Sequence, residues 1–204
     1  MMRVSATLLG AIWCCIASAQ PPVAWLPCAS CHGADGRGEP SKGAPNLTGL
    51  SEAYLRKQFE AFAAGVRGGH EDDPFAQQMA LMAPIYTERV EDLQAVINQT
   101  LSLPHRPSPE TPQGDPGRGA AAYESCSACH GSRGEGNDTL AAPRLKGMSG
   151  WYLVRRYAWF ESTGGGSADP AVVSMAASAR ANPLDDQTLA DIAAHLATFF
   201  EHRE

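Results

Sequence analysis

Two short cysteine motifs contain the residues whose chemistry is clearest. Each consists of two cysteines separated by two residues and followed at once by a histidine: Cys28-Ala-Ser-Cys31-His32 and Cys126-Ser-Ala-Cys129-His130. Two thiols at this spacing can form thioether bonds with the two vinyl groups on one edge of a porphyrin, and the adjacent histidine can then bind the iron from one side. The motifs therefore predict two covalently attached haem c groups, with His32 and His130 as the proximal iron ligands.

Three other kinds of site could use paired cysteines. A single structural zinc could bind all four thiolates, but 94 residues lie between Cys31 and Cys126, far from the spacing of zinc ribbons. Either pair could be a dithiol redox site, but such sites lie in a βαβ context that the sequence does not indicate. The pairs could also be structural disulfides, which exported proteins tolerate. None of these alternatives requires a histidine directly after both pairs, so haem is the favoured prediction.

A second axial ligand decides the functional class, because a haem with one open position can bind small molecules and a haem with both positions filled passes electrons. Met175 is the candidate in the second half, 49 residues after the first cysteine of its motif. Met79 and Met82 both qualify in the first half, and Met79, at 51 residues, is favoured because the offsets nearly agree. Most methionines only fill a core. His70 is an alternative ligand, but it is expected to be an exposed loop residue.

The second half of the chain repeats the first at a spacing of 98 residues. Beyond the haem motifs, matching glycine, proline, leucine and aromatic positions include Gly36 and Gly134, Pro45 and Pro143, Leu47 and Leu145, Tyr54 and Tyr152, and Phe62 and Phe160. A duplicated haem domain explains this match. We therefore predict a first domain at 20–104, a semi-rigid proline-rich linker at 105–115 and a second domain at 116–204.

The elements that must position these residues are predicted to be short helices. An amphipathic helix is expected to begin near Ser51 in the first repeat and near Ser149 in the second, since serine is a good N-cap. A loop that contains the methionine follows, and a helix with one apolar face closes each repeat. A helix at Pro116–Tyr123 has no counterpart before Cys28. Without any alternating strand pattern, the predicted fold class is all-α, with two tandem domains of a few short helices wrapped around haem.

Residues 1–19 are predicted to be an export signal. Arg3 supplies the positive start, residues 4–16 are apolar, and Ala17-Ser18-Ala19 fits a cleavage site before Gln20. The apolar run is short for a membrane span, although an uncleaved anchor is the alternative. We therefore expect a soluble periplasmic protein. Without Arg3, the mature chain has 15 basic and 22 acidic side chains, a net charge of −7, which disfavours a nucleic-acid partner.

From about Trp25 to the C-terminus, the chain resembles the dihaem cytochrome c4 family of class I cytochromes c. In the first half, the motifs that carry this resemblance are Cys28-x-x-Cys31-His32-Gly33, Pro45-Asn46-Leu47-Thr48-Gly49-Leu50, Tyr54-Leu55-Arg56-Lys57-Gln58-Phe59 and Met79-x-x-Met82. In the second half they are Cys126-x-x-Cys129-His130-Gly131, Pro143-Arg144-Leu145-Lys146-Gly147 and Leu184-Asp185-Asp186-Gln187-x-Leu189-x-Asp191-Ile192.

The resemblance implies two class I cytochrome c domains related by pseudo-twofold symmetry, with His/Met-ligated haems facing each other. It also implies that the backbone carbonyls of Pro45 and Pro143 accept hydrogen bonds from the proximal histidines. The family's first domain normally begins with a helix for which this chain has no room. By the same resemblance, such proteins shuttle electrons in the periplasm.

The favoured function is therefore single-electron transfer between redox proteins, such as a dehydrogenase and a membrane oxidase, with membrane contact only through those partners. An alternative is a dihaem subunit of a dehydrogenase complex, for example a flavocytochrome-type sulfide dehydrogenase. A dihaem peroxidase-like enzyme or a haem-based sensor would need an open iron, and Met79 and Met175 argue against both. No catalytic residue is expected.

Overall fold

The computed structural model describes residues 20–69, 73–110, 112–162 and 167–201, so the predicted export signal and His70 lie outside the described residues. The described chain is helical, as predicted. Its helices are α1 (Leu26–His32), α2 (Glu52–Ala63), α3 (Pro74–Thr87), α4 (Val90–Ser102), α5 (Pro116–His130), α6 (Gly150–Ser162), α7 (Pro170–Ala181) and α8 (Asp186–Glu201). Three short 3-10 turns, η1 (Val23–Trp25), η2 (Pro40–Lys42) and η3 (Asp138–Leu140), complete it. Within the described ranges, no helix is long and apolar enough to cross a membrane.

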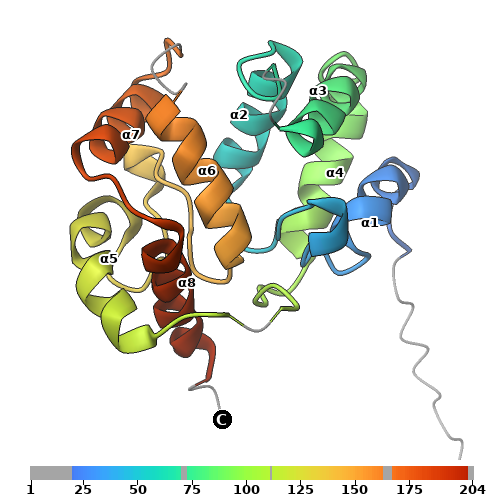
Figure 1. Ribbon diagram of the computed structural model, residues 1–204. Coiled ribbons are helices and arrows are strands. Elements are labelled where there is room, and N and C mark those ends of the chain that lie inside the picture. Colours follow the sequence, from blue (N-terminus) through green and yellow to red (C-terminus); the bar gives the residue numbers. More distant parts are fainter. Residues whose placement is uncertain (1–19, 70–72, 111, 163–166, 202–204) are drawn as a thin grey trace, which may run out of the picture.

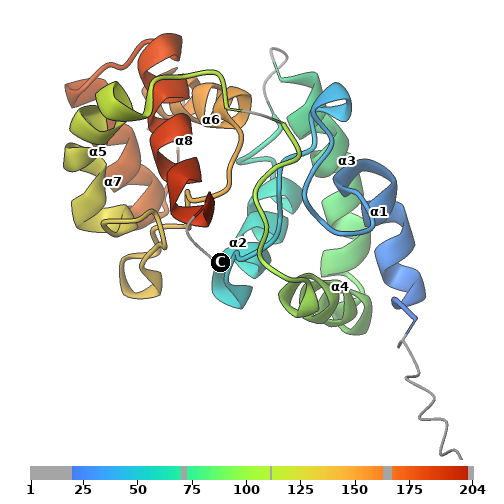
Figure 2. The same ribbon diagram turned by 90° about the horizontal axis from the view of Figure 1, so that it is seen from below.

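The two repeats form two helical bodies that lie side by side, with α1–α4 in one and α5–α8 in the other (Figure 1). The segment that joins α4 to α5 crosses the region where the two bodies meet (Figure 2). This segment is hydrogen-bonded to both of them: Asn46 Nδ2 donates to the Arg106 carbonyl at 2.7 Å, and the Ser108 N–H donates to the Gly147 carbonyl at 2.9 Å. The proline-rich segment therefore has a fixed path between the domains.

Local sequence signals explain where the helices begin. Ser51 caps α2, because its Oγ accepts a hydrogen bond from the Tyr54 N–H at 3.3 Å, and α6 begins directly after Ser149. Both starts confirm the predictions. Three other helices begin at an aspartate followed by proline, where the carboxylate caps the first turn and proline has a suitable φ. These pairs are Asp73-Pro74, Asp115-Pro116 and Asp169-Pro170.

Two predicted element boundaries were wrong. Met79 and Met82 lie inside α3 and Met175 lies inside α7, and not in loops. The physical reason is that an aspartate N-cap, proline at the first helical position and a run of good helix formers start a helix in each segment. Similarly, the helix predicted to end at Tyr123 continues as α5 through the haem motif, because no helix-breaking residue occurs before Gly131.

The buried positions show that the repeat spacing changes from 98 to 96 residues after α2 and α6. Pairs of buried residues at the new spacing are Ala83 and Ala179, Leu93 and Leu189, Val96 and Ile192, and Ile97 and Ala193. A two-residue difference between the segments that follow α2 and α6 accounts for the change. Since buried positions define which helix faces are equivalent, residues in α3 and α4 are compared with those in α7 and α8 at a spacing of 96.

The helical structure that precedes and contains the haem motif differs between the two domains. In the second domain α5 crosses α8, and Arg118 Nε donates to Asp191 Oδ2 at 2.7 Å at the crossing. This bond, with others from the Asp115 backbone and Gln187, lowers the pKa of Asp191 to about 2. In the described part of the first domain, from residue 20 on, η1 and the seven-residue α1 precede His32, and no longer helix does, as the lack of room before Cys28 predicted. Trp25, 1% exposed, takes the position that Tyr123, 2% exposed, holds in the second domain.

The α5–α8 crossing predicts a sharp difference between two neighbouring glycines. A Cβ at Gly119 would collide with the Asp191 carbonyl, whereas a Cβ at Gly117 would meet only the flexible Asp115 carboxylate at 3.2 Å. We expect Gly119→Ala to lower the free energy of unfolding by about 1–3 kcal/mol through overpacking. Gly117→Ala should leave it unchanged or raise it by up to about 1 kcal/mol, because alanine favours helix. Denaturant unfolding of the haem-loaded proteins checks this, and equal effects of the two changes would contradict the close crossing.

Candidate haem sites

The two motif histidines occupy equivalent and buried positions. His32 ends α1 and His130 ends α5, with 6% and 8% of their surfaces exposed. In each case the ring Nδ1 lies 2.8 Å from a proline carbonyl, that of Pro45 for His32 and that of Pro143 for His130. Because a carbonyl oxygen can only accept, Nδ1 carries the proton and Nε2 keeps its lone pair for a metal. Burial lowers the pKa of both histidines, and the proline carbonyls oppose this shift.

The loop after each histidine returns the chain so that the proline can reach the ring. The Gly38 N–H donates to the His32 carbonyl at 2.9 Å, and the Gly136 N–H donates to the His130 carbonyl at 2.8 Å. Both glycines have positive φ, and a Cβ at Gly38 would meet the Ala44 carbonyl oxygen at 2.6 Å. Glycine is therefore required where this loop passes over itself.

The four motif cysteines are not paired in disulfides. Burial raises the pKa of the Cys28 and Cys126 thiols, so these two are neutral rather than activated nucleophiles. Cys28 Sγ lies 3.9 Å from the Tyr86 hydroxyl, which donates to the Ala24 carbonyl at 2.9 Å. Sequence reasoning missed Tyr86, because the repeat does not mark it. The equivalent position in the second domain, 96 residues later, is Asn182.

The candidate methionines differ in their place within the repeat. Met79 and Met175 each lie five residues after the proline that begins their helix, and they are 96 residues apart. In both helices a fully buried alanine, Ala83 or Ala179, follows one turn later. Met82 falls opposite Ser178 at the same spacing and packs against the core cluster that contains Tyr86. The duplicated position is therefore that of Met79 and Met175.

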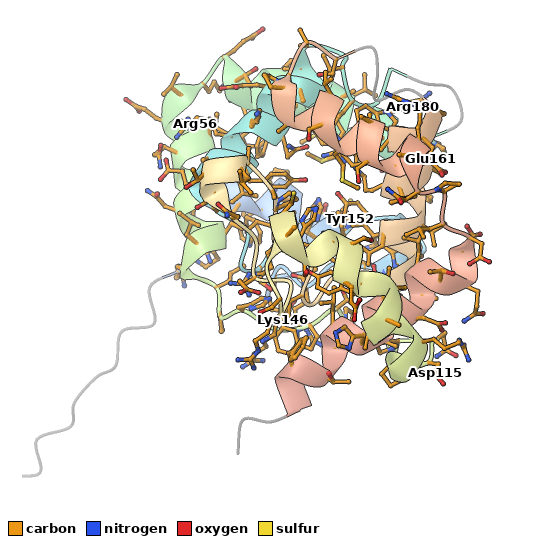
Figure 3. The ribbon with its side chains drawn as sticks, turned by 90° about the vertical axis from the view of Figure 1, so that its left-hand side faces the viewer. Arg56, Asp115, Lys146, Tyr152, Glu161 and Arg180 are labelled. Carbon is orange, nitrogen blue, oxygen red and sulfur yellow. The ribbon has the colours of Figure 1, made fainter. Side chains whose placement is uncertain are left out.

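A cluster that sequence reasoning missed lies between the domains. Tyr54 and Gln58 come from α2, Tyr152 and Arg156 are their equivalents in α6, and Arg67 follows α2. Tyr152 points into the middle of the molecule (Figure 3). Arg67 is only 8% exposed; it donates to the Gln58 side chain and interacts with the Tyr152 hydroxyl, but its Nε has no hydrogen-bond partner. The signal that could have found the cluster is the Tyr54–Tyr152 match in the repeat.

The electrostatics of this cluster show an excess of positive charge. Burial and, to a smaller extent, the nearby charge of Arg67 lower the pKa of Arg156 to about 10. Burial alone would raise the pKa of Tyr152, but the charges of Arg67 and Arg156 outweigh it and lower this pKa. Arg156 contacts the Trp159 ring at 4.3 Å. Two neighbouring guanidinium groups withdrawn from water are stabilised by an anion.

These residues fit haem c in three respects. The four thiols suit thioether bonds, each histidine presents Nε2 while Nδ1 is held by a carbonyl, and the Arg67–Arg156 cluster suits the carboxylates that haem carries as propionates. Tyr54, Tyr152, Cys28 and Cys126 all pack against the same hydrophobic core, so the cluster and the attachment motifs share one interior.

Comparisons with known proteins agree with this geometry. The chain matches the cytochrome c family over residues 25–99 and again over residues 117–199. It is 31% identical over 203 residues to the thiosulfate dehydrogenase electron acceptor of Thiomonas intermedia, a match that covers 91% of this chain and 86% of that protein. It is 28% identical over 137 residues to the cytochrome c4 of Stutzerimonas stutzeri, covering 63% of this chain and 65% of that protein.

A solved structure extends the comparison. The thiosulfate dehydrogenase (TsdBA) of Marichromatium purpuratum has a TM-score of 0.64 and 31% identity, over 84% of this chain and 36% of that one. The chain spans less than two thirds of the length of the Stutzerimonas cytochrome c4 and of a thiosulfate dehydrogenase electron acceptor from the same species. One family domain surrounds each haem motif, so the chain belongs to the cytochrome c family as a two-domain, class I cytochrome c that binds two covalent haem c groups.

Proposed function

We propose that this chain is an exported, periplasmic electron carrier and not an enzyme, and that it passes single electrons between redox partners through two haems. The observation that carries the proposal is that Met79 and Met175 occupy the same position of equivalent helices, at the same spacing as the buried residues around them. A thioether at both sixth positions leaves no open iron for a substrate and raises the reduction potential relative to bis-histidine haem.

In this proposal each residue has one task. Cys28, Cys31, Cys126 and Cys129 hold the haems as thioethers, and His32 and His130 bind the irons through Nε2. The carbonyls of Pro45 and Pro143 keep the imidazole rings in one orientation and make them more basic. The haems, when bound, supply the one-electron chemistry.

A second candidate function is that of the electron acceptor of a thiosulfate dehydrogenase. It is supported by 31% identity to such an acceptor over 91% of this chain. Oxidation of thiosulfate releases electrons, and each of two haems can take up one electron at a time. This candidate is a specific form of the dehydrogenase-subunit alternative, with the same haem ligands.

The carrier proposal predicts the spectra of the purified protein. The oxidised protein should show two low-spin haems with His/Met character by optical and electron paramagnetic resonance spectroscopy, because both axial positions are filled. After reduction, carbon monoxide should bind to neither haem. A high-spin or carbon-monoxide-reactive haem in the fresh protein would contradict the proposal and favour an enzyme or a sensor.

The helix register predicts which first-domain methionine is the ligand. Met79→Leu should make the first haem high-spin and reactive with carbon monoxide, because leucine cannot bind iron. Met82→Leu should keep it low-spin and cost less than about 1.5 kcal/mol of unfolding free energy, as expected for a swap of similar volume. Met175→Leu should open the second haem in the same way as Met79→Leu opens the first. If Met82→Leu alone opened the first haem, Met79 would be the wrong assignment.

The acceptor candidate predicts a direct reaction. In the presence of thiosulfate and a purified thiosulfate dehydrogenase, the oxidised protein should take up about one electron per haem, as each haem iron passes a single electron; stopped-flow absorbance follows this uptake. Omitting thiosulfate is the control. Reduction of the wild type by a flavin-containing sulfide dehydrogenase, but not by the thiosulfate enzyme, would move the assignment to the other kind of complex.

A further inference from the structure

Two ion pairs between the domains are related by the repeat. Lys57 Nζ on α2 lies 2.6 Å from Asp169 Oδ2, and Arg155 Nε on α6 lies 3.7 Å from Asp73 Oδ2. Lys57 and Arg155 are equivalent at the spacing of 98 residues, and Asp73 and Asp169 are equivalent at the spacing of 96. In each domain, therefore, a basic side chain on the equivalent helix contacts the equivalent aspartate of the other domain.

The two aspartates are the N-cap residues of the methionine-bearing helices. Asp73 Oδ1 accepts from the Ala76 N–H and Asp169 Oδ1 accepts from the Ala171 N–H, both at 2.9 Å. Their side chains are 18% and 21% exposed, so each carboxylate joins a helix N-terminus to a cation of the other domain in a largely covered position. Burial alone would raise the pKa of Asp169, but the hydrogen bonds from Lys57 and from the helix N-terminus outweigh burial. The pKa is therefore lowered and the carboxylate stays ionised.

The histidine side of each haem site has a similar link. Asn46, which follows Pro45, donates from Nδ2 to the Gly147 carbonyl of the second domain at 3.1 Å. Arg144, which follows Pro143, donates from Nε to the Gly49 carbonyl of the first domain at 2.9 Å. Donors and acceptors are again equivalent at 98 residues. Both the proline segment and the methionine helix of each domain are thus bonded to the other domain.

We propose that Lys57 and Arg155 are positioning residues that act across the domain boundary, Lys57 on the helix that carries Met175 and Arg155 on the helix that carries Met79. The inference rests on the proposed function, in which these methionines are iron ligands. Each methionine lies six residues after its aspartate on the same continuous helix. A change at the aspartate therefore moves the methionine, and the haem that responds is the one in the domain opposite to the basic residue.

The decisive experiment compares Lys57→Gln with Asp169→Asn in the haem-loaded protein. Asparagine is also a good N-cap, so Asp169→Asn removes the ion pair but keeps the helix start. A looser methionine lowers the reduction potential of the second haem in both variants. A purely through-space charge effect would lower it for Lys57→Gln and raise it for Asp169→Asn, because loss of a negative charge favours the reduced haem.

The haem that responds is identified by two marker variants. Met79→His and Met175→His lower the potential of one known haem each, because bis-histidine haem has a lower potential than His/Met haem. In redox titrations we expect Lys57→Gln and Asp169→Asn to affect the second haem, and Arg155→Gln to affect the first. Carbon monoxide, which binds to neither haem of the wild type, should bind to a fraction of the reduced affected haem, because the lost ion pair no longer holds the methionine helix in place. The double variant should add little to either single variant.

Arg56→Gln is the matched control. Arg56 lies next to Lys57 on α2, at the edge of the molecule, and pairs within its own helix with Glu52 at 3.0 Å (Figure 3). It should change neither haem, and Lys57→Arg should restore the wild-type behaviour. Effects confined to the first haem, opposite shifts from Lys57→Gln and Asp169→Asn, or no shift at all would overturn the inference. If the wild type itself lacked His/Met haems, the proposed function would fail instead.

Discussion

The hydrogen bond from a histidine Nδ1 to a proline carbonyl, 2.8 Å long in both domains, is the constraint on which the other features depend. It fixes the tautomer, so that only Nε2 is available to a metal. To make it, the chain must turn back within 13 residues, which requires Gly38 and Gly136 at positive φ where the backbone crosses itself. The same proline segment then supplies Asn46 or Arg144, through which the haem site of one domain is bonded to the other.

Duplication explains why the interface can connect both haem sites in the same way. Two copies of one domain packed about a pseudo-twofold axis present the same surface to each other, so any bond from one copy is available in reverse. Where the copies differ, the role is kept with different chemistry: Arg155 stands at the position of Lys57 and Arg144 at that of Asn46, and each side chain reaches the equivalent acceptor. Equivalent residues also interact with each other, as Tyr54 and Tyr152 do beside the Arg67–Arg156 cluster.

The sequence was sufficient for the features that depend on short, local patterns. The haem motifs, the repeat, the all-α class and the start of α2 after Ser51 follow from spacing and capping. The methionine segments are helices where loops are predicted, because Asp73-Pro74 and Asp169-Pro170 are helix-start signals that the spacing of iron ligands does not include. Arg67, Tyr86 and the interdomain ion pairs could not be found, since they depend on how two domains pack, and a sequence compared only with itself shows equivalence but not contact.

The haem motif lies in the long helix α5 in the second domain and in the short helix α1 in the first, and this difference makes the domains depend on each other to different extents. In the second domain, α5 crosses α8 and encloses the haem motif with that domain's own residues, including the Arg118–Asp191 pair. Among the described residues of the first domain, the haem motif is preceded by η1 and contained in the short α1, with Trp25 buried beside it. Its buried polar residues Asn46 and Thr48 are instead satisfied by the carbonyl of Arg106 in the connecting segment. Because a buried polar group without a partner is costly, the first domain needs this segment in place, and the segment is held by the second domain through Gly147. The first haem site is therefore the one whose structure depends more on the assembled pair.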